Sequence, residues 1–313
     1  MPRRSRVRLD LLLHAVVLIG VAWAALTFVR AGDVAAALSR LQPALVLLVL
    51  GLGVLYTVFR SFIFAVVTRG VSDLPTALVM RAYLSAEATA LLPGGVAART
   101  ALLNQLGVPV SRGLVPVLAV SILDQVFFGL VLIVAVVILP DARSAAWLLP
   151  VLVLLLVLLS VPAARNFVGR LVQPLLARFG ARDGWAHFEE ALRGTLRPSR
   201  LAFAFLLTVL AFTLKVFVLS LCLREVGVQL PPSLLLFAFV LPTLAGRLTP
   251  TPGGAGVTEA GMVAFLATFG GVAVEDGLVA TLLFRAATVF VPALLGGVLY
   301  GAAWRGSKHL ERT

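Results

Sequence analysis

The sequence has 313 residues, of which 60% are apolar and only 13% are charged, and its mean hydropathy is +1.06. A soluble fold must cover its core with polar and charged side chains, so this composition excludes a soluble domain. Several apolar runs, such as 201–223, reach the ~20 residues that a helix needs to cross a bilayer. The sequence therefore predicts an all-α polytopic membrane protein.

The net charge of +12 does not indicate a nucleic-acid partner. Cytoplasmic loops of membrane proteins carry excess arginine and lysine, and the sequence shows no basic face with interleaved aromatic residues. The single cysteine, Cys222, lies in an apolar run, so neither a disulfide nor a cysteine metal site is possible. The three histidines are scattered, which gives little support to zinc chemistry or a Ser-His-Asp triad. The sequence also has no glycine-rich phosphate loop. We therefore expect no catalytic residues, no metal and no cofactor.

Six apolar segments predict full spans, and two further segments predict helical hairpins. Proline removes a backbone donor and glycine weakens a helix, so each hairpin is expected to break where these residues gather. The breaks lie at 93–95 (PGG) and 250–254 (PTPGG). In chain order the predicted elements are spans 9–29 and 43–68, hairpin 76–107, spans 113–139, 145–164 and 201–223, hairpin 232–270, and span 277–304.

Positive charge sets the predicted orientation. Four arginines precede the first span, as in a signal peptide, but its apolar stretch is too long and no small-residue cleavage site follows. With the N-terminus in the cytoplasm, sixteen arginines and lysines fall in cytoplasmic segments and four in external ones, as the positive-inside rule requires. If only the first hairpin crossed the membrane, the arginine-rich loop 165–200 would face outside. Eight full spans remain an alternative.

The loop 166–200 carries apolar residues at helical spacing. This pattern predicts a helix on the cytoplasmic membrane surface, with Arg170 and Arg178 toward lipid phosphates. A connector packed on the other helices is the alternative.

An internal repeat follows the two hairpins. Residues 107–115 (GVPVSRGLV) and 271–279 (GVAVEDGLV) are identical at six of nine positions. The pair Ser111-Arg112 is predicted inside and Glu275-Asp276 outside, as two inverted copies would show. Residues 1–140 and 141–313 then form two inverted halves of a single membrane domain, a recurring transporter design with its ligand site near the midplane. Chance similarity in an apolar chain is the alternative.

Ionisable residues in hydrocarbon are costly, so they usually pair or line a cavity. A buried structural ion pair is the alternative for each, and it is weighed most heavily for Asp124 and Lys215. The candidates for substrate binding are Arg81, Glu87, Arg99 and Asp124 in the first half, and Arg247, Thr251, Gly253, Gly254, Glu259 and Arg285 in the second.

The second break combines several of these candidates. Thr251 can cap a new half-helix with Pro252 at its first position, so that free N–H groups and the helix dipole attract an anion. Arg247 and Arg285 are expected close by, with Glu259 holding the arginines in place or contacting a substrate amine. The adjacent glycines would allow close approach to the backbone.

Residues 251–260 (TPGGAGVTEA), followed by Phe284-Arg285 and Pro292, resemble the C-terminal signature of a known family. It is the lysylphosphatidylglycerol synthase transmembrane-region family, also called flippase-like domain proteins, and the resemblance covers nearly the whole chain. It implies a prokaryotic cytoplasmic (inner) membrane protein with a role in lipid translocation. In bifunctional relatives a soluble aminoacyl-transferase domain follows; the chain ends nine residues after Trp304, so we expect no such enzyme.

One departure from the family concerns its first hairpin, which commonly carries a Gly-Glu-x-x-Arg element after the proline. Here residues 94–99 read GGVAAR, with the arginine, Arg99, but no glutamate.

These observations predict a flippase-like transporter that moves a phospholipid between leaflets and holds its headgroup in a polar cavity between the hairpins. One alternative is an intramembrane lipid-linked glycosyltransferase, suggested only by the external Glu275-Asp276 pair. Another is a non-transporting subunit of a membrane complex. The expected partner is a membrane phospholipid and not a nucleic acid, and a homo-oligomer is left open.

Overall fold

The computed structural model describes residues 41–90, 95, 97–138, 190, 195, 197–247, 249 and 254–304. In this part of the chain all regular structure is helical and no strand occurs. The predicted all-α class is therefore confirmed. The predicted spans 9–29 and 145–164, and most of the loop 166–200, lie outside the described residues.

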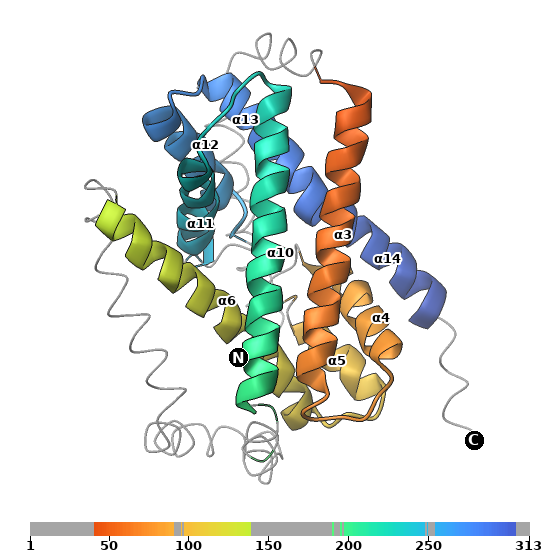
Figure 1. The fold of residues 1–313 in the computed structure, drawn as a ribbon. Helices are drawn as coiled ribbons and strands as arrows, with labels where there is room; N and C mark the ends of the chain where they lie inside the picture. The colour runs from red at the N-terminus through yellow and green to blue at the C-terminus, as the bar shows by residue number, and fades with distance from the viewer. Residues whose placement is uncertain are drawn as a thin grey trace, which may run out of the picture. The chain divides into compact units, whose positions relative to one another are not determined.

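Within the described ranges, four helical segments are long and apolar enough to cross a membrane. They correspond to the predicted spans 43–68, 113–139, 201–223 and 277–304. Their outward faces carry large apolar side chains, as contact with hydrocarbon requires. The segments are α3 (Pro43–Thr68), α6 (Val110–Ile138), α10 (Pro198–Glu225), and Val274–Ala302, which joins α13 (Val274–Arg285), a π-helix (Ala286–Phe290) and α14 (Val291–Trp304) (Figure 1).

Both predicted hairpins are pairs of short helices whose arms contact each other. The first consists of α4 (Thr76–Ala86), a 3-10 turn (Glu87–Thr89) and α5 (Ala97–Gln105), and the second of α11 (Pro232–Arg247) and α12 (Val257–Gly270). At ~1.5 Å per residue these arms are about 14 to 24 Å long, which is less than the ~30 Å of hydrocarbon in a bilayer. Among the described residues, none of these arms is a candidate membrane span by length and composition.

The repeated sequence at 107–115 and 271–279 forms a turn with a left-handed glycine in both places. Gly107 and Gly271 have left-handed backbones, with φ of +88° and +63°, which favour glycine. The following N–H groups, of Val108 and Val272, each donate 3.1 Å hydrogen bonds to carbonyls of the preceding helix. The next span begins within three residues. The repeat therefore encodes the junction between each hairpin and the span after it.

The chain divides into two compact units. The first-hairpin unit contains α3 from Val54, the first hairpin, α6, α10 through Leu214, and α14 from Pro292. The second-hairpin unit contains α3 through Gly53, α10 from Lys215, the second hairpin, α13 and the π-helix. Each unit thus joins one hairpin to the end of the span before it and to the span that follows.

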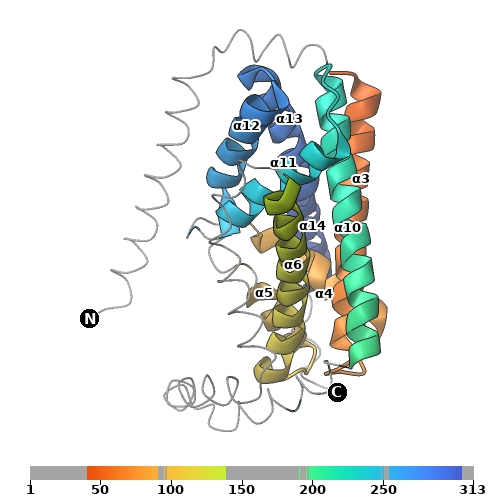
Figure 2. The same ribbon diagram turned by 60° about the vertical axis from the view of Figure 1, so that its left-hand side comes forward.

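Helices α3 and α10 run antiparallel to each other (Figure 2). In the second-hairpin unit, the N–H of Gln42, just before α3, donates a 2.7 Å hydrogen bond to Oε2 of Glu225 at the end of α10. In the first-hairpin unit, the late residues of α3, such as Phe64, share a core with early residues of α10, such as Ala204. The spans that precede the two hairpins therefore point in opposite directions.

Helix α14 approaches the first hairpin closely at Gly296. A Cβ atom at this position would lie 2.6 Å from the carbonyl oxygen of Leu84 and 2.7 Å from the amide nitrogen of Ala88. Only glycine allows this distance between the two backbones.

Candidate functional site

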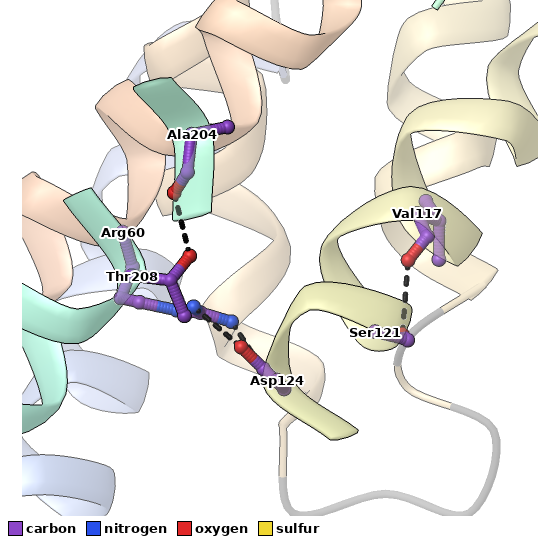
Figure 3. A network of polar contacts seen from close by, with 6 residues as sticks. All are labelled: Arg60, Val117, Ser121, Asp124, Ala204 and Thr208. Atoms are coloured by element: carbon purple, nitrogen blue, oxygen red, sulfur yellow. Dashed lines mark hydrogen bonds and ion pairs between the residues drawn. The ribbon is translucent and has the colours of Figure 1, made fainter. Parts of the chain in front are cut away.

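The deepest charge pair lies in the first-hairpin unit, where α3 meets α6 (Figure 3). Nη1 of Arg60 is 2.7 Å from Oδ1 of Asp124, and Nη2 is 2.9 Å from Oδ2. The two residues are only 6% and 4% exposed. The ring of Phe212 lies 5.4 Å from the guanidinium carbon. Both carboxylate oxygens are therefore engaged in a bidentate pair, the strongest geometry for these groups.

Two hydroxyls drawn with this pair are directed to their own helices. Thr208 donates to the carbonyl of Ala204 at 2.8 Å, and Ser121 donates to the carbonyl of Val117 at 2.9 Å (Figure 3). The sequence identified Asp124 as a candidate, but it did not identify Arg60, in the predicted span 43–68, as its partner. The signal in the sequence that could have revealed this pair was the presence of opposite charges within two predicted spans. The geometry indicates a structural ion pair that holds α3 to α6.

A second ion pair joins α5 to the 3-10 turn of the first hairpin. Nη2 of Arg99, on α5, is 2.8 Å from Oε1 of Glu87, in the 3-10 turn after α4. The guanidinium carbon lies 4.3 Å from the centre of the Tyr83 ring, a cation–π distance. The two side chains are 19% and 14% exposed, so they are more accessible than the Arg60–Asp124 pair. Residues 94–99 contain no glutamate, so the acidic partner of Arg99 is Glu87, which comes from the first arm of the hairpin.

The start of α12 differs from its predicted form. Its N-cap is Gly256, with φ of +84°, and not Thr251, which lies outside the described residues together with Gly253. Gly254 also has a left-handed backbone, with φ of +69°, so α12 begins only after both glycines. Whether Thr251 caps a turn before them is not tested by the described residues. The N–H of Gly256 donates a 2.7 Å hydrogen bond to Oε2 of Glu259. An internal carboxylate therefore accepts one of the N–H groups that we expected an external anion to use.

The other oxygen of Glu259 reaches the end of α13. Oε1 lies 2.5 Å from Nε of Arg285, and the two side chains are 17% and 8% exposed. Glu259 therefore connects the start of α12 to Arg285 through its two oxygens. The sequence left two roles open for Glu259, holding the arginines in place or contacting a substrate amine, and the contact with Arg285 is the arrangement expected of the first. Two other candidates from the sequence, Arg81 and Arg247, are exposed.

The arms of the second hairpin approach closely at glycine residues. A Cβ atom on Gly246 would lie 2.1 Å from Oγ1 of Thr258, and one on Gly254 would lie 2.7 Å from the same oxygen. Gly261 faces Pro242 with a corresponding distance of 3.2 Å. Helices in membranes need small residues where their backbones approach each other this closely.

This packing predicts different effects for two alanine substitutions. Gly254→Ala and Gly271→Ala both place a side chain on a left-handed backbone, which costs ~1–2 kcal/mol. Gly254→Ala should lower the melting temperature further, because its Cβ also meets Thr258 and lies 3.1 Å from the Gly246 backbone, whereas Gly271 has nothing within 4 Å. Thermal unfolding of the purified protein measures both. Equal losses would contradict the close approach of the arms.

Lys215 is a further charged residue of the second-hairpin unit. Nζ of Lys215, on α10, lies 5.4 Å from the Phe239 ring centre and 5.7 Å from that of Phe284. These rings come from α11 and α13 and are themselves 6.2 Å apart in an edge-to-face arrangement. The sequence read Lys215 as structural or functional with equal weight and assigned it no partner. Its aromatic neighbours depend on helix packing, which sequence spacing does not reveal.

Apolar membrane-length helices with buried charge pairs among them define an integral membrane protein. Residues 11–296 match the family described as Lysylphosphatidylglycerol synthase TM region. The chain belongs to this family, as the sequence resemblance predicted. No curated protein matches the sequence.

Proposed function

We propose that the protein is a flippase-like transporter, which binds a membrane phospholipid by its headgroup and moves it between leaflets. The observation that carries the proposal is the charge pair at each hairpin, Glu87–Arg99 and Glu259–Arg285. Ionisable groups within a membrane protein are costly and mark substrate pathways by default. Membership of a family with a proposed role in lipid translocation supports the same conclusion.

The arrangement of the helices supports re-entrant hairpins in inverted halves. The hairpin arms are shorter than a bilayer is thick, and the two hairpins follow antiparallel spans. Hairpins that follow antiparallel spans enter the membrane from opposite sides. Broken helices in inverted repeats are a transporter design in which ligands bind at the breaks. Because of the positive-inside rule, we also propose that the N-terminus lies on the cytoplasmic side of a prokaryotic inner membrane.

The two hairpin pairs suit a headgroup because they can exchange partners. A phosphate can take the place of the carboxylate beside an arginine, and a headgroup amine can take the place of the arginine beside a carboxylate. Each internal charge then remains paired, so the exchange avoids the cost of an isolated charge. The Arg60–Asp124 pair is less exposed and is proposed as structural. No catalytic step is needed, and we propose that this membrane domain is not itself an enzyme.

Lipid movement in vesicles tests the proposal. The protein is reconstituted with a fluorescent phospholipid, and a membrane-impermeant quencher reports how fast the probe changes leaflets. The double variant Glu87→Gln with Arg99→Gln should slow the protein-dependent rate about tenfold, as the loss of one charged hydrogen bond to the ligand implies. Arg112→Gln is the control, because Arg112 forms an exposed pair with Glu190 on the surface.

Two results would overturn the proposal. One is a wild-type rate equal to that of protein-free vesicles. The other is turnover of a lipid substrate by the detergent-solubilised protein, which would identify an enzyme.

A further inference from the structure

Tyr83 is a tyrosine of α4 whose ring lies against the Arg99 guanidinium. The guanidinium carbon is 4.3 Å from the ring centre, and the ring lies 5.3 Å from that of Phe64 on α3. Tyr83 is only 3% exposed, so the packing of the helices fixes the position of its ring. Arg99 is therefore held in two ways, by the ring of Tyr83 and by the carboxylate of Glu87.

The hydroxyl of Tyr83 is an unused donor. A buried tyrosine usually finds a hydrogen-bond partner for this group, yet no described residue forms a hydrogen bond with it. The charges that act on the hydroxyl most strongly are those of Arg99 and Glu87. The ion pair of the first hairpin thus has a free hydroxyl beside it.

Arg99 also has donors to spare. A guanidinium carries five N–H groups, and within the described part of the chain its hydrogen bond is the one from Nη2 to Glu87. The side chain is partly exposed. Several donors around one positive charge favour an anion with several oxygens, and arginine matches phosphate through paired N–H groups.

The carboxylates of the two hairpins are held differently. Glu259 uses both oxygens, one for the N–H of Gly256 at the start of α12 and the other for Arg285. The carboxylate of Glu87 forms one hydrogen bond with the described residues, the one from Arg99. Its release therefore breaks a single contact and no helix cap. Exchange of a carboxylate for a phosphate is easier at the first hairpin for this reason.

We propose that Arg99 and Tyr83 bind the phosphate group of the ligand at the first hairpin. The guanidinium supplies the positive charge and paired N–H donors, and the Tyr83 hydroxyl donates to a further phosphate oxygen. The Tyr83 ring keeps the guanidinium in place while the phosphate replaces Glu87. The inference rests on the proposed function and deepens it, because it names the group that is recognised and the hairpin that recognises it.

Tyr83→Phe tests the hydroxyl, since phenylalanine keeps the ring against Arg99 and removes only the polar atom. The full-length protein in detergent is titrated with dihexanoyl phosphatidylglycerol, and heat release gives the affinity. We expect about tenfold weaker binding, equal to ~1.4 kcal/mol, with an unchanged melting temperature. Tyr300→Phe is the matched control: it removes the same atom from an exposed tyrosine of α14 and should keep the wild-type affinity.

Arg99→Gln and Glu87→Gln test the charges, and their expected effects are opposite. Arg99→Gln should abolish measurable binding of phosphatidylglycerol. Glu87→Gln should tighten binding severalfold, because it removes the carboxylate that competes with the phosphate for Arg99. A purely structural ion pair predicts weaker binding in both variants, since either change disturbs the same contact.

The source of the phosphate is tested with two further probes, inorganic phosphate and uncharged dihexanoylglycerol. Binding of phosphatidylglycerol alone assigns the site to a lipid headgroup. Binding of inorganic phosphate that is equally sensitive to Tyr83→Phe and Arg99→Gln assigns it to phosphate from either source.

Wild-type affinity in Tyr83→Phe or in Arg99→Gln would overturn the inference, as would weaker binding in Glu87→Gln or preferred binding of the uncharged lipid. These results are independent of the proposed function, because they measure binding in detergent. A protein that moves lipid in vesicles but binds phosphatidylglycerol unchanged in these variants would refute this site alone. One that binds through Arg99 and Tyr83 but moves no lipid would refute transport alone.

Discussion

Arg285→Leu is expected to destabilise the protein by ~3–5 kcal/mol and to abolish lipid movement, because it leaves the Glu259 carboxylate in the interior without its cation. A second change, Glu259→Gln, should restore most of the lost stability. Glutamine is uncharged and keeps an oxygen that can accept the hydrogen bond from Gly256, so the start of α12 remains capped. Thermal unfolding in detergent and the vesicle assay are measured on the same preparations.

The double variant separates the two roles of this pair. A structural pair predicts that stability and lipid movement return together. A pair that exchanges partners with the headgroup predicts a stable protein that moves no lipid, which is the result we expect. Glu259→Gln alone is the control for the carboxylate. Full activity in the double variant would remove both residues from the proposed site.

Asp124→Leu is expected to destabilise the protein by a similar ~3–5 kcal/mol, because Arg60 is only 6% exposed and loses both oxygens of its bidentate partner. The double variant Arg60→Leu with Asp124→Leu should recover most of that stability, since buried ion pairs are replaceable by apolar side chains. Unlike the double variant at Arg285 and Glu259, it should also move lipid at the wild-type rate. The same two assays apply.

The contrast between the two double variants is the informative result. A stable but inactive Arg60→Leu with Asp124→Leu variant would return Asp124 to the group of ligand contacts that its sequence suggested. Failure of that variant to recover stability would show that α3 and α6 need a polar contact at this level.

The spans were predictable because hydrocarbon imposes one simple requirement, a long apolar run. The predicted and observed ends of α3 agree, at residues 43 and 68. Other helices start about three residues earlier than the apolar runs do. Helix α10 begins at Pro198, a favourable first position, although Arg200 is charged. Helix α13 begins at Val274, and the acidic pair read as an external loop occupies its first turn, where negative charge is favourable.

The candidate site was predictable in its residues but not in its pairs. The cost of a charge in hydrocarbon identifies Glu87, Arg99, Glu259 and Arg285 without any structure. Which of them meet depends on how the helices pack, and spacing along one helix carries no such information. The start of α12 at Val257 was not predicted, because sequence does not show which glycine adopts a left-handed backbone.

The π-helix at Ala286–Phe290 sets the rotational phase of the last span. In an uninterrupted α-helix, Arg285 and Gly296 would share a face, because eleven residues make about three turns. A π turn holds one residue more than an α turn, which shifts the later residues by about 100° around the axis. The number of residues in this stretch therefore fixes the register along the last span. A one-residue deletion there is expected to shift every later residue by about 100° around the helix axis, whereas a substitution keeps the count.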